Sequence, residues 1–296
     1  MSGFLLVNKP GDITSFGAVK RIKYLAHEKR VGHTGTLDPM ATGVLPVFIG
    51  RATVLSNYLL TAKKEYIATV RLGLITDTLD ITGKVIKENA VSLNNKQVLS
   101  ALNNFVGNIS QVPPQYSAIK KNGVRAYDLA RNGTEVQLEP RDITVYSIEQ
   151  LKELDQNFEF SFKTVVSKGT YIRSLVRDIG EFLGCGAVLT ELVRTNTAGF
   201  SIENCVALED LNEDNISKFI LPPEKALIGF DDLYVTDLQA VRFANGGALS
   251  LDRIKINNPE NEKIFKVFGK NKFIGLGIVD TKNQQLSVKC IVDNEL

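Results

Sequence analysis

Residues 31–46, VGHTGTLDPMATGVLP, place one carboxylate, that of Asp38, among three glycines, two prolines and one of the chain's two histidines. Asp followed by Pro is typical of a helix entrance, in which the Asp caps the helix and the Pro takes its first position. A capping carboxylate is held rigidly in its ionised form, which a carboxylate nucleophile also needs at neutral pH. The stretch therefore predicts a structural cap or a nucleophile, and one residue can be both.

Few other side chains in the sequence offer a rival chemistry. The two histidines are His27 and His33, and no C-x-x-C, H-E-x-x-H or H-x-E motif is present, which disfavours a zinc hydrolase or deaminase. The P-loop motif, a G-x-G-x-x-G motif after a strand and the G-x-S-x-G elbow of hydrolases are also missing from the sequence. We therefore expect carboxylate chemistry without a metal ion or a cofactor.

Composition and charge indicate a cytoplasmic protein with an anionic partner. The 296 residues are 44% hydrophobic and 23% charged, and three scattered cysteines fit a reducing compartment better than a disulfide framework. No apolar run is long enough to predict a signal peptide or a membrane span. Residues 1–64 hold nine Lys/Arg and three Asp/Glu, a balance of +6, so that with a total of +2 the remaining residues carry −4. This distribution suggests an anionic partner, with a polynucleotide first in line, and a merely solvated basic face is an equal alternative.

The elements that must position Asp38 are a mixture of strands and helices. Residues 4–9 predict a buried strand that stops at Pro10, and residues 15–32 predict a helix with Ser15 as its N-cap and Gly32 just past its end. Residues 65–76 alternate as a strand does, and a further helix is expected to begin near Tyr171. Because strands and helices do not alternate regularly, the sequence predicts an α+β fold with a mainly antiparallel mixed sheet and flanking helices.

Two further segments differ in composition and pattern from the rest of the sequence. The proline-led, basic and aromatic segment 111–133 predicts a surface insertion that grips a substrate. After the two prolines of the segment FILPPEKALIGFDDLYV, the tail has the pattern of short strands, among them LQAVRFANGGAL at 238–249. We therefore predict two domains, a catalytic domain at 1–230 and a small β-rich domain at 231–296.

Residues 31–46 resemble the signature of the bacterial tRNA pseudouridine-55 synthase family. The further segments LLVNKPGDITSF, KEYIATVRLGLITDTLDITG, QVPPQYSAIKKNGVRAYDLAR and SKGTYIRSLVRDIGEFLGCGAVLTELVRT resemble the family's successive motifs, in the same order. The likeness is close over residues 3–200, and the tail resembles the family's PUA-type RNA-binding domain more loosely. It implies an enzyme that isomerises uridine to pseudouridine at position 55 in the T loop of tRNA, with the T-arm stem-loop as its partner.

The resemblance also implies a set of catalytic residues. Asp38 is the expected nucleophile, and Arg173 is expected to pair with it. Tyr66 is expected to stack on the target uracil with its hydroxyl near C5. The resemblance assigns the substrate-binding residues as follows: Tyr171 and Leu192 line the uracil pocket, His33 takes the place that the flipped base leaves, and Lys9, Lys120 and Arg125 contact RNA or support the pocket.

One position departs from the family pattern. After Leu192 the family often carries two basic residues, whereas this chain has Val193 before Arg194. The departure puts one phosphate or pocket contact in doubt and leaves the expected reaction intact.

The expected reaction fits these residue types. Isomerisation breaks the N1–C1′ bond and joins C5 to C1′ without oxidation or loss of a group, so it needs no cofactor. The carboxylate could attack C1′, add to C6 or remove the C2′ proton, and the sequence leaves these routes open. Each route needs the base outside its stack, at a cost of a few kcal/mol, of which an aromatic platform recovers roughly 1–3 kcal/mol. A paired guanidinium keeps a shielded carboxylate charged and oriented.

Two rival functions fit parts of the same sequence. An RNA-binding or tRNA-folding factor could grip the loop without any chemistry, and a carboxylate glycosylase could release uracil and leave an abasic site. The complete motif set favours isomerisation over both. Because no long apolar surface stripe is evident, we expect a monomer.

Overall fold

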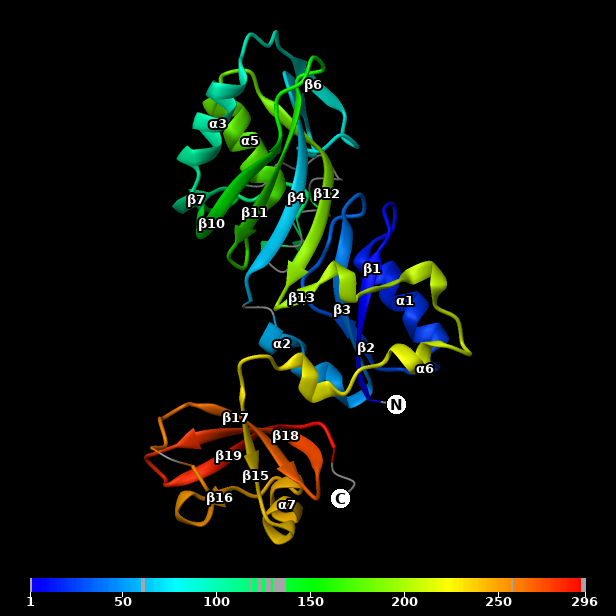
Figure 1. Cartoon of the computed structure of the whole chain (residues 1–296), viewed down its shortest axis with the longest axis vertical. Helices are drawn as coiled ribbons and strands as arrows, with labels where there is room; N and C mark the ends of the chain where they lie inside the picture. The colour runs from blue at the N-terminus through cyan, green and yellow to red at the C-terminus, as the bar shows by residue number, and fades with distance from the viewer. Residues whose placement is uncertain are drawn as a thin grey trace.

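A ten-stranded mixed sheet forms the larger part of the computed structural model (Figure 1), which describes residues 2–59, 62–117, 119–121, 124–125, 129, 137–256 and 258–293. Its main path runs β14-β1-β3-β12-β4-β11-β10-β7, with β2 added to β3 and β13 added to β12. The strands are β1 (Gly3–Lys9), β2 (Val31–His33), β3 (Thr42–Ile49), β4 (Lys64–Leu72), β7 (Gly107–Gln111), β10 (Arg141–Lys152), β11 (Glu159–Val166), β12 (Ala187–Thr197), β13 (Phe200–Ser201) and β14 (Val206–Ala207). Within the described residues, β1–β14 and β3–β12 are its parallel pairs and the others are antiparallel, which confirms the predicted fold class.

Short helices and two hairpin ribbons complete the described chain. The α-helices are α1 (Ser15–Leu25), α2 (Ser56–Leu59), α3 (Asn95–Asn104), α5 (Ile172–Phe182), α6 (Ile216–Phe219) and α7 (Asp237–Ala244). The 3₁₀ helices are η1 (Gly50–Leu55), η2 (Ile202–Asn204), η3 (Leu208–Asp210), η4 (Pro223–Ala226) and η5 (Leu251–Arg253). The ribbons pair β5 (Leu74–Thr76) with β6 (Val85–Glu88), and β8 (Lys120–Lys121) with β9 (Val124–Arg125). Among the helices described, none has the length and apolar character needed to cross a bilayer.

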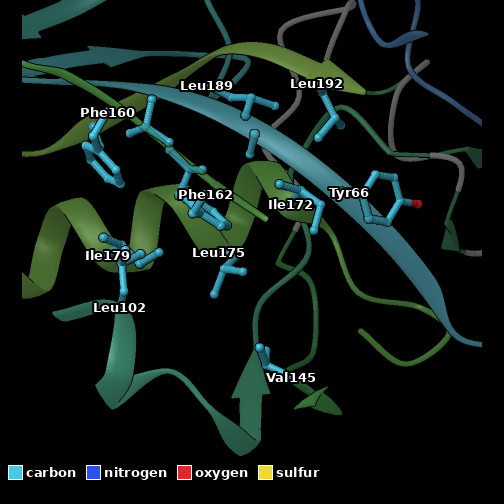
Figure 2. Close-up of a cluster of buried hydrophobic side chains, with 14 of the residues drawn as sticks. Tyr66, Leu102, Val145, Phe160, Phe162, Ile172, Leu175, Ile179, Leu189 and Leu192 are labelled. Atoms are coloured by element: carbon cyan, nitrogen blue, oxygen red, sulfur yellow. The ribbon is translucent and has the colours of Figure 1, made fainter. Parts of the chain in front are cut away.

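The principal core lies between α3, α5 and one face of the large sheet. Figure 2 shows its side chains, with Phe160 and Phe162 from β11 packed over the helix that carries Leu175 and Ile179. The alternation of β4 and β11, in which every second residue is buried, turns one face of each strand toward these helices. Each fully buried Phe or Leu stabilises the fold by about 1.5–3 kcal/mol, so this cluster fixes α5 on the sheet and thereby places the residues at its N-terminus.

Helix α1 covers the sheet at β1 and β3, but it differs from the prediction at both ends. Its N-cap is Thr14, whose side chain accepts a hydrogen bond from the Gly17 backbone N–H, and Ser15 is the first helical residue. The helix ends at Leu25, well before Gly32, because His27 has a left-handed φ of 48°. Residues 31–33 form β2, which pairs with β3.

A second sheet of five strands lies at the other end of the molecule (Figure 1). It consists of β15 (Asp231–Tyr234), β16 (Leu249–Ser250), β17 (Ile264–Gly269), β18 (Lys272–Asp280) and β19 (Gln285–Ile291). It has its own core, and a different apolar cluster joins it to the large sheet, with Phe273 and Val292 on one side and Phe4 and Phe48 on the other.

The prediction of a strand at 238–249 was wrong over most of its length. Thr236 and Gln239 form a capping box that starts α7, and only Leu249 belongs to a strand. The apolar residues that suggested a strand divide between two faces of this helix, since Ala240 and Phe243 are buried while Leu238 is 86% exposed. The helical period of the two buried residues was therefore masked by exposed apolar neighbours.

Candidate active site

Asp38 lies in the loop that connects the antiparallel pair β2 and β3. The loop is closed at its start by a hydrogen bond from the Thr34 N–H to the Pro46 carbonyl (3.1 Å). Asp38 itself opens a turn in which the Ala41 N–H donates to the Asp38 carbonyl (3.1 Å), and no helix follows. The predicted helix cap was therefore wrong. The turn leaves the Asp38 carboxylate available for a side-chain partner.

The first residues of α1 hold the chain next to Asp38. The Ser15 hydroxyl, which is buried, accepts from the Leu37 N–H (2.8 Å) and donates to the Leu37 carbonyl (3.0 Å). One side chain thus satisfies both backbone groups of the residue before Asp38. This double contact explains why Ser15 is not the cap, because its hydroxyl points to the loop and Thr14 caps the helix in its place.

Lys9, at the end of β1, holds the residue after Asp38. Its ammonium donates to the carbonyls of Pro10 (2.7 Å), Ile13 (2.8 Å) and Pro39 (3.1 Å), and the side chain has no exposed surface. Burial lowers the pKa of Lys9 to about 8, an effect that the nearby negative charge of Asp38 opposes. Of the two roles expected for Lys9, RNA contact and pocket support, this geometry favours pocket support.

Arg173, in the first turn of α5, meets the Asp38 carboxylate. Its Nη2 donates a hydrogen bond to Oδ1 (2.9 Å), and its Nε lies 2.8 Å from Oδ2 in an ion pair. The expected pairing is therefore present in the structure. The two side chains differ in access, since Asp38 is 32% exposed and Arg173 only 5%. The carboxylate can be reached from outside the fold while its counter-charge stays behind it.

The remaining guanidinium contacts of Arg173 involve a second carboxylate that the sequence analysis missed. Nη1 donates to the Thr78 carbonyl (3.0 Å), Nη2 also donates to the Tyr116 carbonyl (3.0 Å), and Asp80 Oδ2 lies 3.8 Å from Nη1. Asp80 is buried and accepts from the Thr82 backbone N–H and from two threonine hydroxyls. A carboxylate surrounded by threonines in the segment TDTLDIT was the available signal for this residue.

The start of α5 is fixed from β7 by a pair of amide hydrogen bonds. Gln111 accepts from the Tyr171 N–H at Oε1 (2.9 Å) and donates from Nε2 to the Tyr171 carbonyl (3.1 Å). Tyr171 is the N-cap residue, as the predicted helix start near this position requires. Burial raises the pKa of the Tyr171 phenol, and the negative charge of Asp38 acts in the same direction. The phenol is therefore neutral at neutral pH.

Tyr66 and Leu192 stand on the neighbouring strands β4 and β12, at the end of the principal core. Both are buried, and they belong to the same cluster as Leu37 and Ala41 of the catalytic loop, which we define as residues 34–41. Figure 2 shows the Tyr66 ring beside Ile172, with its hydroxyl directed away from the other labelled side chains. The structure thus brings the residues expected to bind uracil to the side of the loop where Asp38 lies.

The other end of the catalytic loop rests on Arg194 of β12. This side chain has no exposed surface; its Nε donates to the Val44 carbonyl (2.7 Å) and its Nη2 to the Gly35 carbonyl (2.8 Å). Burial lowers the pKa of His33, and the positive charge of Arg194 lowers it further, so this imidazole is neutral at neutral pH. Val193, the position that departs from the family pattern, pairs with Thr42 in the sheet.

The predicted RNA-gripping insertion is described only in part. The backbones of Lys120 and Arg125 pair across the β8–β9 ribbon. The side-chain contacts expected of these two residues lie outside what the structure describes, as do residues 118, 122–123, 126–128 and 130–133 of the same segment.

Two family models match consecutive parts of the chain. TruB family pseudouridylate synthase (N terminal domain) matches residues 23–172, and tRNA pseudouridylate synthase B C-terminal domain matches residues 173–228. The chain is 48% identical to tRNA pseudouridine synthase B of Clostridium tetani over 94% of this chain and 95% of that one. It is 40% identical to the protein of the same name from Chromobacterium violaceum, over 94% and 90% of the two chains.

Solved structures share the fold over nearly the whole length. A chain in the crystal structure of a Cbf5-Nop10-Gar1 complex is 27% identical with a TM-score of 0.75, over 98% of this chain and 85% of that chain. A chain of an H/ACA RNP bound to a substrate RNA containing 2′-deoxyuridine is 26% identical with a TM-score of 0.73, over 99% and 86%. With two family models in sequence, relatives at 40–48% identity and this shared fold, the chain belongs to the TruB family of pseudouridylate synthases.

Proposed function

We propose that this chain isomerises uridine to pseudouridine at position 55 in the T loop of tRNA, with Asp38 as the nucleophile. Family membership supplies the coarser part, since the chain is a pseudouridine synthase whose relatives are named for tRNA. The Asp38–Arg173 pair is the observation that supports Asp38 as the nucleophile. It presents one charged, oriented carboxylate at the edge of a cluster that holds Tyr66 and Leu192.

Arg173 holds the nucleophile in one orientation and places a positive charge beside it. It contacts both carboxylate oxygens of Asp38. Its two bonds to backbone carbonyls prevent the guanidinium from following the carboxylate. Attack at C1′, addition to C6 and removal of the C2′ proton all need this arrangement beside an extruded nucleotide.

Tyr66 supplies the platform for the flipped uracil in this proposal. An aromatic ring that closes the end of an apolar core, with its hydroxyl turned outward, can stack on a base and reach its edge. Leu192 completes the apolar wall. His33 is neutral, so it can fill the gap in the RNA stack without bringing an unbalanced charge into it.

Charge and shape complementarity would supply most of the affinity for the T-arm. The exposed basic residues of 1–64 face the phosphates in this proposal, and the β-rich region 231–296 serves as a PUA-like RNA-binding domain. The three cysteines are free thiols, which fits an enzyme that acts in the cytoplasm, and we propose that it acts as a monomer. RNA affinity should therefore weaken steeply as salt rises.

Tritium release from [5-³H]uridine-labelled substrate tests the proposed function, with full tRNA and an isolated T-arm stem-loop as substrates. The wild-type protein should release tritium from both. The variant Asp38→Asn should release none while its RNA affinity stays within about tenfold, because phosphate contacts dominate binding. Asp214→Asn, at an exposed position, is the matched control and should retain full activity.

Three results would contradict the proposed function. Full turnover by Asp38→Asn would remove the nucleophile from it. RNA binding without tritium release by the wild type would favour a binding factor. Free uracil with an abasic site in the product would identify a glycosylase.

A further inference from the structure

The first turn of α5, which carries Arg173, is not stabilised by its own sequence. Its N-cap residue is Tyr171, which makes no side-chain capping bond, whereas Ser, Thr, Asp and Asn are the residues that cap well. None of the residues in this turn is acidic, and the charge of Arg173 lies close to the helix N-terminus, where the helix dipole disfavours a cation. The position of Arg173 therefore depends on contacts from outside the helix.

Gln111, the last residue of β7, supplies such a contact. Its amide accepts from the Tyr171 N–H (2.9 Å) and donates to the Tyr171 carbonyl (3.1 Å), so one side chain satisfies both backbone groups of the N-cap residue. The same carbonyl accepts the first helical hydrogen bond of α5, from the Leu175 N–H (3.0 Å). Gln111 is buried, and a buried amide is costly unless both of its ends are hydrogen-bonded. The contact therefore fixes the start of α5 to the end of β7.

The segment that follows Gln111 reaches the guanidinium itself. Residues 113–114 are two buried prolines, which restrict the backbone between Gln111 and Tyr116. The Tyr116 carbonyl accepts from Arg173 Nη2 (3.0 Å), the nitrogen that also donates to Asp38 Oδ1 (2.9 Å). Gln111 thus joins the helical turn from which Arg173 extends to the segment whose carbonyl holds its guanidinium.

The other half of the ion pair is held in the same way. The Ser15 hydroxyl satisfies both backbone groups of Leu37, the residue before Asp38. Gln111 satisfies both backbone groups of Tyr171, two residues before the arginine. In both cases one buried polar side chain fixes the backbone next to a member of the pair, so the geometry of the pair is set by the backbone on each side.

We propose that Gln111 is a positioning residue of the active site, which holds the Arg173 guanidinium in the direction that the Asp38 carboxylate requires. Gln111 does not contact the RNA in this proposal, and it acts through the first turn of α5. The inference rests on the proposed function, to which it adds the residue that sets the geometry of the ion pair. Its effect on turnover should exist only while Arg173 is present, which separates it from a residue that merely stabilises the fold.

A double-mutant cycle with Arg173 tests this role. Gln111→Met keeps the length of the side chain and removes both hydrogen bonds. It should lower the single-turnover rate of tritium release from the T-arm stem-loop by about tenfold to a hundredfold, because small displacements of reacting groups have effects of this size. RNA affinity should stay within about twofold. In the Arg173→Ala background the same change should lower the rate by less than about twofold, since the group that it positions is absent.

Asn89 provides a matched control at the other end of the same helix. Its Nδ2 donates to the carbonyl of Cys185, which follows α5 (2.8 Å). Asn89→Ala therefore removes a hydrogen bond that holds the helix without disturbing the turn that carries Arg173. Its rate should stay within about twofold of the parent protein in both backgrounds.

A milder variant keeps the test available if thermal melting shows that Gln111→Met does not fold. The buried Ser174 hydroxyl donates to the Val112 carbonyl (2.9 Å), and so also joins the first turn of α5 to the segment after β7. Ser174→Ala should lower the rate by about threefold, because Gln111 still holds the turn. In the Arg173→Ala background it should cause no further loss.

Equal losses in the two backgrounds would overturn the positioning role, since Gln111 would then act independently of Arg173. An unchanged rate in Gln111→Met, or a weaker RNA affinity at an unchanged rate, would overturn it as well. A loss in Asn89→Ala as large as that in Gln111→Met would assign the effect to a general loosening of α5. Absence of tritium release by the wild type would instead contradict the proposed function.

Discussion

Two buried arginines meet the catalytic loop, Arg173 at Asp38 and Arg194 at Gly35, and they are stabilised in different ways. Arg173 contacts the Asp38 carboxylate and lies near that of Asp80, so its charge is balanced within the protein. Arg194 donates to two backbone carbonyls and has no carboxylate partner in the described chain. The first arrangement orients a reactive side chain, whereas the second holds the backbone and leaves a net positive charge. The difference separates the side chain that orients the reactive carboxylate from the side chain that holds the loop backbone.

Loss of Arg173 should have the largest effect on turnover. In Arg173→Ala, Asp38 loses its oriented partner and Asp80 is left buried without the nearby guanidinium, so kcat should fall by about 10²–10³-fold. Single-turnover tritium release measures this loss, with RNA affinity measured in parallel. Arg177→Ala is the matched control, since Arg177 lies one turn later and pairs with Asp178. A retained kcat with a raised KM would assign Arg173 to binding instead.

Loss of Arg194 should act first on stability. Arg194→Met removes two hydrogen bonds from a charged donor and leaves the Val44 and Gly35 carbonyls buried, at a cost of about 3 kcal/mol. Urea unfolding measures this change, and kcat should recover in part at low temperature as the loop refolds. A variant with unchanged stability and a kcat loss as large as that of Arg173→Ala would erase the distinction between the two arginines.

The sequence predicted the Arg173 end of the loop better than the Arg194 end. Asp38, Arg173 and Tyr66 fall in motifs whose residue types already suggest chemistry. Asp80 and Arg194 carry weaker signals, because a carboxylate among threonines and an arginine in an alternating strand are also common among ordinary surface residues. Their importance depends on which strands become neighbours, and the parallel β3–β12 contact that places Arg194 under the loop joins segments about 150 residues apart in sequence.

The elements were predicted by their periodicity and missed where local contacts decide their ends. The helix start at Tyr171 is confirmed, and the strand at 65–76 is confirmed as β4 and β5, which are separated at Gly73 where φ is 84°. The start of α1 was misplaced by one residue because Thr14 and Ser15 are both good caps. The Ser15 hydroxyl is hydrogen-bonded to the Leu37 backbone, so Thr14 is the cap. The helix at Asp237–Ala244 was missed because its apolar residues lie on two faces.

Ser15 tests whether the Asp38 end also depends on backbone anchoring. Ser15→Ala removes both hydrogen bonds to Leu37 and should cost about 2 kcal/mol, with a kcat about tenfold lower as the loop loosens. Thr14→Ala is a close control: it should cost about 1 kcal/mol as an N-cap and leave kcat unchanged. Equal kcat losses in the two variants would mean that the helix terminus, and not the contact with Leu37, controls the loop.

The smallest effect concerns pH at the Arg194 end. The pKa of Lys64 is about 8 in the folded protein and 10.5 in the absence of burial, so between these values the unfolded state binds more protons. The stability of the wild type therefore rises with pH in this window. The unfolding free energy of the wild type minus that of Lys64→Met should increase by about 1 kcal/mol from pH 8 to 10. Lys9 has the same shift, but it is present in both proteins and cancels in the difference.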